Sequence, residues 1–250
     1  MIIKSIAAFA LLLLPVSIAA QSPAVDAARA AMADYDGETA RSTLTLACDA
    51  ADTAACRVLL GYLSGRYSDE EQEEAYTLGQ TLCANDDLLG CVTFARLVEN
   101  MAHSGADQSL ALDSLEKACR GDFYSACPSA AEMADRGEIA TQDKTLALEL
   151  ADLGCKASHA RSCQLSGDLL RQAGWDTEDD AVLQQSWDDS RVAYRSGCDL
   201  GNMQSCYGLA RFLIDGHMGD IDREGGRALL KFACENDLTM CEEYVRALIP

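Results

Sequence analysis

Two kinds of residue in this chain of 250 could support covalent chemistry: a serine followed by a lysine one helical turn later, and twelve cysteines. Ser114 and Lys117 form the only Ser-x-x-Lys in the chain. Serine β-lactamases use this spacing to activate a nucleophile, but they also need further motifs such as Ser-Asp-Asn and Lys-Thr-Gly. Neither motif occurs here. We therefore interpret Ser114 as a small residue on a helix and Lys117 as its solvated neighbour.

Histidines and acidic residues give no sign of a metal or cofactor site. His103, His159 and His217 each fall in an apparent loop of a different segment, and no Ser or Cys accompanies them at a fixed local spacing. Zinc sites pair cysteines two to four residues apart, which none of the cysteine pairs here does. The acidic stretch from Asp176 to Asp180 lacks the glycine and spacing of a calcium loop. We expect ordinary exposed histidines, no metal and no cofactor.

The cysteines form six consecutive pairs, separated by seven residues in five pairs and by six in the last. They are Cys48 and Cys56, Cys83 and Cys91, Cys119 and Cys127, Cys155 and Cys163, Cys198 and Cys206, and Cys234 and Cys241. The first cysteines advance by 35, 36, 36, 43 and 36 residues, a period typical of helical repeat arrays. With no cysteine left over, an exported chain is expected to form six disulfides, each within its own pair.

The first twenty residues predict export. Met1 to Lys4 is charged, Ile6 to Leu14 is an apolar run, and Pro15 to Ala20 ends in small residues. This order is typical of a secretory signal cleaved near Ala20, and the run is short for a membrane span. Cleavage removes Lys4 and no acid, so the net charge changes from -20 to -21, with 19 basic against 40 acidic residues. Such a charge disfavours nucleic acid and anionic membranes as partners. We expect a periplasmic or secreted protein with no membrane span after cleavage.

The residues around the cysteines predict helices. The residue eight positions before each first cysteine is small, which allows a close helix crossing. These residues are Ala40, Ala75, Ala111, Ala147, Ser190 and Gly226. Positions three, four and seven after the second cysteine share one helix face and are mostly apolar, as in Leu59, Leu60 and Leu63. Each unit should therefore run from the second cysteine through helix A, a loop and helix B to the next first cysteine.

This repeating order of cysteines and helices predicts an all-α protein, an α-α superhelical solenoid of about thirteen helices over residues 21–250. We expect a signal peptide at 1–20, an N-terminal cap at 21–47 and a C-terminal cap at 234–250. The repeats between the caps are expected at 48–82, 83–118, 119–154, 155–197 and 198–233. In the N-terminal cap, Pro23 to Tyr35 should form helix A and Glu38 to Ala47 helix B, with a turn at Asp36 and Gly37.

With this register, three stretches resemble Sel1-like repeats, relatives of the tetratricopeptide repeat. The stretches are Leu115-Glu116-Lys117-Ala118-Cys119, Ser205-Cys206-Tyr207-Gly208-Leu209-Ala210 and Leu230-Lys231-Phe232-Ala233-Cys234. The resemblance covers nearly all of residues 21–250 and is nearest to the disulfide-bearing form of the Helicobacter cysteine-rich proteins. It departs where seven extra residues lengthen the interval from Cys163 to Cys198. The resemblance implies a scaffold for protein or peptide partners. The cysteine-rich branch is also associated with binding penicillin and slowly hydrolysing β-lactams.

Helix A residues that do not pack on neighbouring helices should line the concave binding surface of such a solenoid. The column six residues after each second cysteine is apolar and reads as core: Tyr62, Leu97, Met133, Leu169 and Phe212. The columns one and five residues after it carry Arg57, Arg96, Tyr207 and Arg211, beside residues such as Gln164 and Asp168. Arg and Tyr are frequent anchors of binding interfaces, although the same columns could be a merely solvated face.

The two tryptophans, Trp175 and Trp187, both lie in the lengthened repeat. Insertions in repeat arrays tend to form loops, often on the binding face, so an exposed Trp175 would be a further anchor. We expect Trp187 to be buried. The sequence thus predicts an exported protein- or peptide-binding scaffold of the bacterial cell envelope with an unidentified partner. The alternative is a slow β-lactam-binding or β-lactam-hydrolysing enzyme.

Overall fold

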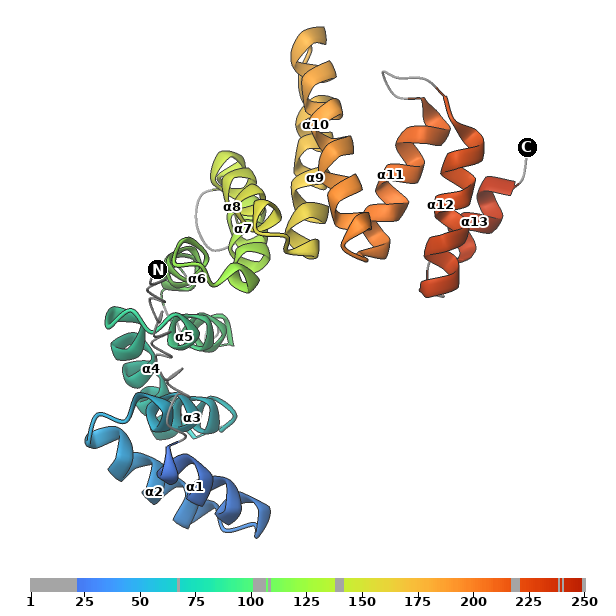
Figure 1. Cartoon of the computed structure of the whole chain (residues 1–250). Coiled ribbons are helices and arrows are strands. Elements are labelled where there is room, and N and C mark those ends of the chain that lie inside the picture. Colours follow the sequence, from blue (N-terminus) through green and yellow to red (C-terminus); the bar gives the residue numbers. More distant parts are fainter. Residues whose placement is uncertain are drawn as a thin grey trace, which may run out of the picture. The chain divides into compact units, whose positions relative to one another are not determined.

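The computed structural model describes residues 22–66, 68–100, 107, 109–137, 142–216, 221–237, 239 and 241–248. All regular structure in these ranges is helical, with thirteen α-helices and one short 3-10 helix (Figure 1). This confirms the predicted all-α repeat fold. The predicted signal peptide at 1–20 lies outside the described residues. Within the described ranges, none of the helices combines the length and apolar composition that a membrane crossing requires.

The chain forms two compact units, one ending at Leu59 and the other beginning at Leu60. The first contains α1 (Pro23–Ala33), α2 (Gly37–Asp49) and the start of α3 (Thr53–Ser64). Helix α1 ends two residues before the predicted Tyr35, because Tyr35 itself adopts a left-handed conformation with φ 61°. Helix α2 then begins at Gly37, where the Asp36 side chain accepts a hydrogen bond from the backbone N–H of Thr39 at 3.0 Å. The cap residue therefore decides where the helix begins.

The second unit contains the end of α3 and the remaining helices, and from α4 onward each helix packs on the next. They are α4 (Asp69–Ala84), α5 (Leu88–Asn100), α6 (Ser109–Arg120), the 3-10 helix η2 (Tyr124–Ala126), α7 (Cys127–Arg136), α8 (Lys144–Lys156), α9 (Ala160–Trp175), α10 (Asp180–Asp199), α11 (Met203–Asp215), α12 (Arg223–Asn236) and α13 (Cys241–Leu248). Apart from α1, the A helix of the N-terminal cap, the A helices are α3, α5, α7, α9, α11 and α13. The even-numbered helices from α2 are the B helices. Helix α9 also contacts α7 and α11, so these three A helices lie side by side.

All six disulfides form within their own pairs, as predicted, with Cα–Cα distances of 4.4 to 4.8 Å. Each joins the end of a B helix to the following A helix. In five of these junctions the third residue after the first cysteine adopts positive φ. These residues are Ala51, Asp86, Asp122, Ser158 and Gly201. Only one is the glycine that this conformation favours, so the junction imposes the left-handed residue on other types at a cost of about 1 kcal/mol.

In two of the junctions, the residues immediately before the two cysteines pack against each other and differ in size in a complementary way. A methyl group added to Gly154 would lie 2.7 Å from Cβ of Ser162, and one added to Gly90 would lie 2.7 Å from Cβ of Leu82. The glycine precedes the first cysteine in one junction and the second in the other. Since contacts below 3 Å do not form without movement, each of these two junctions has room for a side chain larger than glycine at only one of the two positions. The small-residue column is likewise buried from Ala40 to Gly226.

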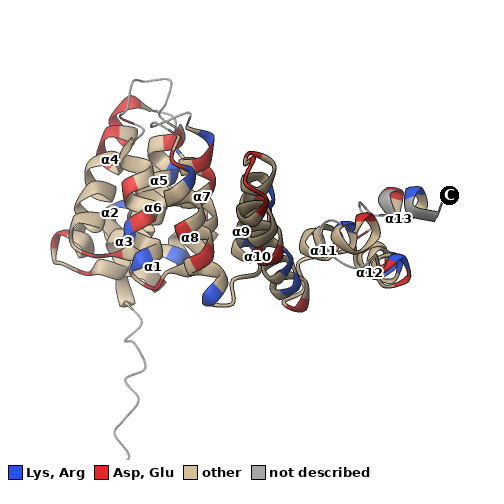
Figure 2. Ribbon diagram, turned by 90° about the horizontal axis from the view of Figure 1, so that it is seen from above, with Lys and Arg blue, Asp and Glu red and all other residues tan. Residues whose placement is uncertain are grey.

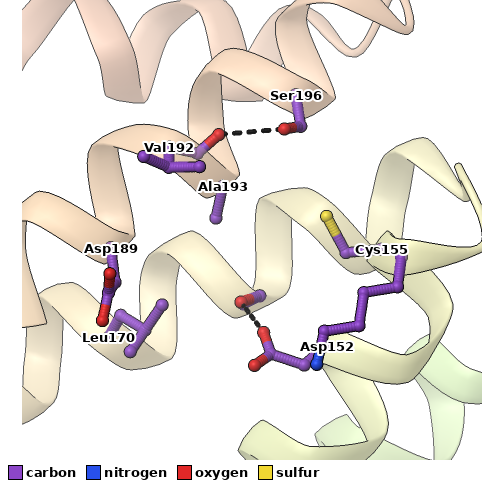
Figure 3. Close-up of a pocket in the computed structure, with 9 residues that line it drawn as sticks. Asp152, Cys155, Leu170, Asp189, Val192, Ala193 and Ser196 are labelled. Carbon is purple, nitrogen blue, oxygen red and sulfur yellow. Dashed lines mark hydrogen bonds between the residues drawn. The ribbon is translucent and has the colours of Figure 1, made fainter.

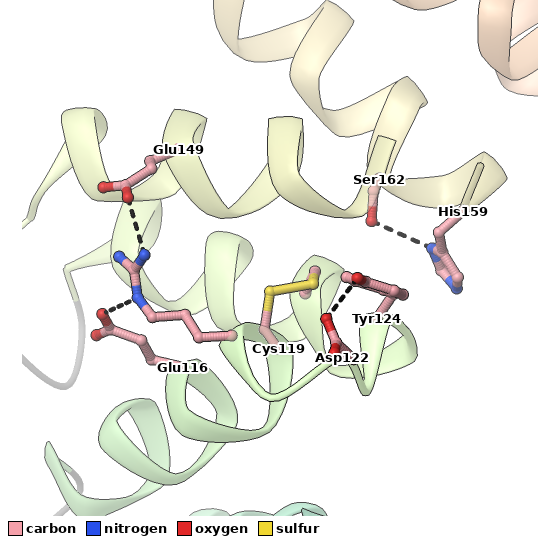
Figure 4. Close-up of a disulfide and its surroundings, with 9 residues drawn as sticks. Glu116, Cys119, Asp122, Tyr124, Glu149, His159 and Ser162 are labelled. Carbon is pink, nitrogen blue, oxygen red and sulfur yellow. Dashed lines mark hydrogen bonds and ion pairs between the residues drawn. A yellow bond between two sulfur atoms is a disulfide. The ribbon is translucent and has the colours of Figure 1, made fainter. Parts of the chain in front are cut away.

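Ion pairs add contacts between successive B helices. Arg120 of α6 donates through Nε to Glu116 at 2.7 Å and through Nη1 to Glu149 of α8 at 2.9 Å, close to the Cys119–Cys127 disulfide (Figure 4). The hydrogen bonds that Arg120 donates to these two carboxylates raise its pKa. The Arg120 side chain is 42% exposed, so solvent weakens the pair, and its role is chiefly to align neighbouring helices.

The lengthened repeat departs from the expectation of an inserted loop. Its extra residues extend the helices, so α9 has 16 residues and α10 has 20. Trp187 of α10 is buried, as predicted, with 6% of its surface exposed. It packs at the place where Gly174 leaves room, because a methyl group there would lie 2.3 Å from Cδ1 of its ring. Trp175 is 58% exposed and stacks edge-to-face on Trp187 with ring centroids 4.9 Å apart.

Candidate functional site

Two pockets lie between consecutive A helices of the second unit, and some of the residues lining them come from the predicted columns. The first, between α5 and α7, has a volume of about 230 Å³. Its lining includes Leu89, Val92, Leu115, Phe123 and Ala126, with Arg96 and Glu99 contributing charge. An apolar lining beside a few charged groups is typical of a site for a partner's side chain. The structure thus places the predicted Arg96 beside an apolar pocket.

The second pocket, between α9 and α11, has a volume of about 130 Å³ and brings the predicted Tyr207 and Arg211 together. Arg211 donates through Nη1 to the Tyr207 hydroxyl at 3.1 Å and through Nε to Asp215 at 3.0 Å. The hydrogen bond with Tyr207 is the main cause of the raised pKa of Arg211. This guanidinium therefore keeps its charge at the edge of the pocket.

Tyr194 reaches this pocket from the B helix α10. Only 1% of its surface is exposed, and its ring passes between Gly167 of α9 and Gly208 of α11. A methyl group on either glycine would lie 2.7 Å from the ring. The Tyr194 hydroxyl donates to Asp168 at 2.5 Å and accepts from Nε of Arg171 at 3.2 Å. Burial, and then the charge of Asp168, raises the pKa of Tyr194, so the hydroxyl stays protonated and remains a donor.

Further hydrogen bonds hold Asp168 in place. Gln164, one turn earlier on α9, donates to Asp168 at 3.3 Å. The Gln164 carbonyl in turn accepts from the Asn202 side chain at 3.3 Å, next to the start of α11. The nearest Arg171 nitrogen lies 3.8 Å from the Asp168 carboxylate, which is an ion pair without a hydrogen bond. The pocket is therefore a preorganised polar site with donors on both sides.

The remaining predicted anchors lie elsewhere. Arg57 is an exposed residue of α3 in the first unit. Trp175 ends α9 and lines neither of these two A-helix pockets. Sequence reasoning did not identify Tyr194 or Arg171. The available signal was the pair of glycines inside helices, Gly167 and Gly208, since a helical glycine marks a close approach of another group.

A third pocket, of about 440 Å³, lies beside the B helices α8 and α10, and residues of α9 contribute to it. Its lining combines the charged side chains of Asp152, Lys156 and Asp189 with the apolar Leu170 and Val192 (Figure 3). The Ser166 hydroxyl donates to Asp152 across this pocket. The Asp152 carboxylate is therefore engaged by a side chain of the protein itself.

The geometry gives no support to Ser114 and Lys117 as a catalytic pair. Ser114 is 6% exposed, and its hydroxyl donates to the backbone carbonyl of Leu110 at 2.6 Å. The Lys117 ammonium donates to the carbonyl of Cys83 at 2.6 Å and pairs with Asp86 at 2.8 Å. Lys117 therefore fastens α6 to the end of α4 instead of lying free in solvent. A nucleophile must be accessible and hydrogen-bonded to its base.

We expect purified protein to show no turnover of a chromogenic cephalosporin that depends on Ser114. The Ser114→Ala variant should hydrolyse the substrate at the same rate as the parent protein, because the hydroxyl is buried and bonded to the backbone. The initial rate of hydrolysis, followed by the change in absorbance of the cephalosporin, measures the activity of both proteins. A loss of about a hundredfold or more in Ser114→Ala would restore the serine hydrolase interpretation.

The histidines do not assemble into a site within the described residues. His159 is partly buried at the start of α9, where its Nδ1 lies 3.1 Å from the Ser162 hydroxyl (Figure 4). Burial lowers its pKa below the usual 6.5, so it is mainly neutral at pH 7 and not the freely exposed histidine we expected. His103 and His217 lie outside the described residues. In the described ranges, no cluster of three potential metal ligands occurs.

Two solved structures of low sequence identity are similar to this chain. Comparison of the sequence with protein-family models and with curated proteins gives no match. A Sel1 repeat protein from Oxalobacter formigenes is similar with a TM-score of 0.60 and 12% identity, covering 88% of this chain and 87% of that one. A protective antigen of uropathogenic Escherichia coli strains, described as displaying an SLR fold, has a TM-score of 0.49 and 12% identity, covering 85% of this chain and 53% of that one. The helical hairpins, their order along the chain and the first of these comparisons establish that this protein has the Sel1-like repeat fold.

Proposed function

We propose that this protein is an exported scaffold that binds an extended segment of a partner protein along the A helices of its second unit. The observation that carries the proposal is that the A helices leave lined pockets between them, at α5 and α7 and at α9 and α11. The predicted anchors Arg96, Tyr207 and Arg211 border these pockets. Repeat arrays bind extended segments in this way, because neighbouring repeats offer similar sites in a row.

The distribution of charge also supports the A helices as the binding face. The six A helices together carry seven arginines and seven acidic residues, whereas the whole chain has 20 basic against 40 acidic residues. The acidic excess therefore lies on the B helices and connecting segments, and Figure 2 shows charges of both signs on the ribbon. A partner that approaches the A helices meets alternating charges instead of a uniformly negative surface, which favours specific pairing over general repulsion.

The cysteines support an oxidising compartment. All twelve cysteines form disulfides, and none is free. Six disulfides would not persist in a reducing cytosol. The apolar run and small residues of 1–20 favour export as well. The periplasm, or the space outside the cell, is therefore the compartment in which we place the protein and its partner.

The proposal predicts that peptides selected from a displayed random library against residues 21–250 bind at the A helices. The double variant Arg96→Glu with Arg211→Glu should weaken binding of the selected peptides by about tenfold or more, because it removes two anchors and adds repulsion. The matched control is Arg223→Glu with Lys231→Glu, which makes the same change of charge on exposed residues of the B helix α12. Fluorescence polarisation of labelled peptide measures both affinities.

Equal losses in the two double variants would mean that net charge alone controls the binding, and would count against the A-helix face. Failure to select any peptide that binds above background would also count against the proposal. Circular dichroism of both variants must match that of the parent, since all four residues are exposed and substitution should leave the helices intact.

A further inference from the structure

We infer that the pocket between α9 and α11 receives a carboxylate of the bound segment, with Arg171 and Arg211 as its donors. This inference rests on the proposed function and specifies the chemistry of one subsite. The two arginines belong to neighbouring A helices and border the same pocket. Both are half exposed, at 48% for the Arg171 side chain and 54% for that of Arg211.

Arg171 is the less neutralised of the two cations. Its Nε donates to the Tyr194 hydroxyl, but its nearest carboxylate oxygen, on Asp168, lies 3.8 Å away and beyond hydrogen-bonding distance. Its terminal nitrogens therefore keep donors for a ligand. Burial lowers the pKa of Arg171, but the hydrogen bond with Tyr194 and the charge of Asp168 raise it overall. The charge of Arg211 is a smaller contribution that opposes the rise, as expected when two guanidinium groups face one space. An anion between them removes that repulsion, and a planar carboxylate accepts two parallel N–H groups from a guanidinium.

At the floor of the pocket, the Tyr194 hydroxyl holds Arg171 in place. A phenylalanine would fill the slot between Gly167 and Gly208 as well as Tyr194 does, so the distinctive contribution of Tyr194 is its hydroxyl. That hydroxyl donates to Asp168 and accepts from Arg171, and Gln164 supplies Asp168 with a second donor. Asp168 is thus largely satisfied without binding Arg171 directly. Tyr194 is a positioning residue, because its hydroxyl orients the Arg171 guanidinium, and Arg171 is the group that binds the carboxylate.

The size of the pocket limits the ligand. A volume of about 130 Å³ accommodates a few water molecules, at about 30 Å³ each in the liquid. It therefore admits a carboxylate and its neighbouring methylene groups but no bulky ring. Both an Asp or Glu side chain and a peptide C-terminus present this chemistry. The two sources are separable with small probes that carry only one of them.

The test is a titration of ¹⁵N-labelled residues 21–250 with three probes, followed by NMR at the Gly208 amide and the arginine Nε–H groups. Acetyl-glutamate amide carries a side-chain carboxylate only, acetyl-glutamine carries a C-terminal carboxylate only, and acetyl-glutamine amide carries neither. We expect saturable shifts with one or both acids and none with the neutral probe. The acid that binds more tightly identifies the source. Shifts that are equal for all three probes, or absent with both acids, would overturn the inference.

Variants assign the effect to the named residues. Arg171→Gln should weaken binding of the acid by about tenfold, because a charge-assisted hydrogen bond is lost. Tyr194→Phe should also weaken it while leaving the thermal midpoint nearly unchanged. The matched control is Tyr124→Phe, which removes a hydroxyl that donates to Asp122 at 2.6 Å outside the pocket and should leave binding unaltered. Unchanged affinity in Arg171→Gln would reject the inference.

This result is separable from the fate of the proposed function. Selected peptides that depend on Arg96 and Arg211 but bind equally well after every carboxylate is amidated would reject the carboxylate subsite and leave the scaffold function standing. Acids that bind the pocket while no displayed peptide binds would do the opposite. The two experiments therefore fail independently.

Discussion

Reduction of the six disulfides is expected to unfold most of the helical array at room temperature. Closing a loop of about nine residues contributes about 2.5 kcal/mol in the chain-entropy model, so the six together contribute about 15 kcal/mol. That sum is comparable to the total unfolding free energy of a domain, which is about 5 to 15 kcal/mol. Residues 21–250 treated with excess reductant should therefore lose most of the far-ultraviolet circular dichroism signal of their α-helices, because isolated short helices are marginally stable in water.

A single junction provides the graded version of this test. Replacing Cys155 and Cys163 by alanine should lower the midpoint of thermal unfolding, because this disulfide joins α8 to α9 within the second unit. Repeat arrays need not unfold in one step, so hydrogen exchange of the amides in α8 and α9 should show the loss most clearly. If the helical circular dichroism signal remains after reduction of all six disulfides, packing alone holds the array. That outcome would contradict the stabilising role that we assign to the disulfides.

Gly154→Ala is expected to destabilise the array by about 1 to 3 kcal/mol, the usual cost of adding volume to a closely packed contact. The added methyl group would lie 2.7 Å from Cβ of Ser162 and 2.9 Å from Cβ of Cys127. Neither atom is the end of a flexible chain, so the backbone of α8 or α9 must move. In an uncrowded helix the same substitution stabilises, because alanine is the better helix former. Denaturant unfolding of the oxidised protein measures the difference.

Gly61→Ala is the matched control, since Gly61 lies inside α3 and a methyl group there would meet nothing within 4 Å. It should be neutral or stabilising by up to about 1 kcal/mol. The double variant Gly154→Ala with Ser162→Gly should recover much of the lost stability, because it moves the glycine to the other side of the junction, as in the pair Leu82 and Gly90. If Gly154→Ala is as benign as Gly61→Ala, the size-matching account is wrong.

The fold could be predicted from the sequence because every junction repeats the same covalent and steric requirements. Two cysteines must approach within disulfide distance, and a small residue must lie where a B helix crosses its neighbour, so both signals recur with the period of the repeat. The structure of the lengthened repeat is harder to predict from the sequence, because seven extra residues are compatible with a loop or with longer helices. The choice depends on Trp187, which packs into the space left by Gly174 only if α9 and α10 are both extended.

The candidate site could be predicted only in part. Tyr207, Arg211 and Arg96 were found because they occupy recurring positions on the A helices. Tyr194 belongs to a B helix, and it reaches the A-helix pocket only because Gly167 and Gly208 leave a passage for its ring. A glycine in a sequence indicates that something approaches closely, but the identity of the approaching group is a property of the tertiary structure. Arg57 and Trp175 show the converse, since suitable residue types at suitable positions need not meet in one pocket.

The size matching at the cysteine junctions limits how this gene can be rearranged. A crossover between two repeats that falls between paired cysteines would place Leu82 opposite Ser162, or Gly154 opposite Gly90, and produce either a collision or a void. A crossover between an A helix and the following B helix keeps each matched pair together. Functional duplications and artificial chimaeras should therefore have their breakpoints between helices A and B. The unit that is duplicated or exchanged as a whole is then the disulfide-linked junction of a B helix with the next A helix, and not the helical hairpin.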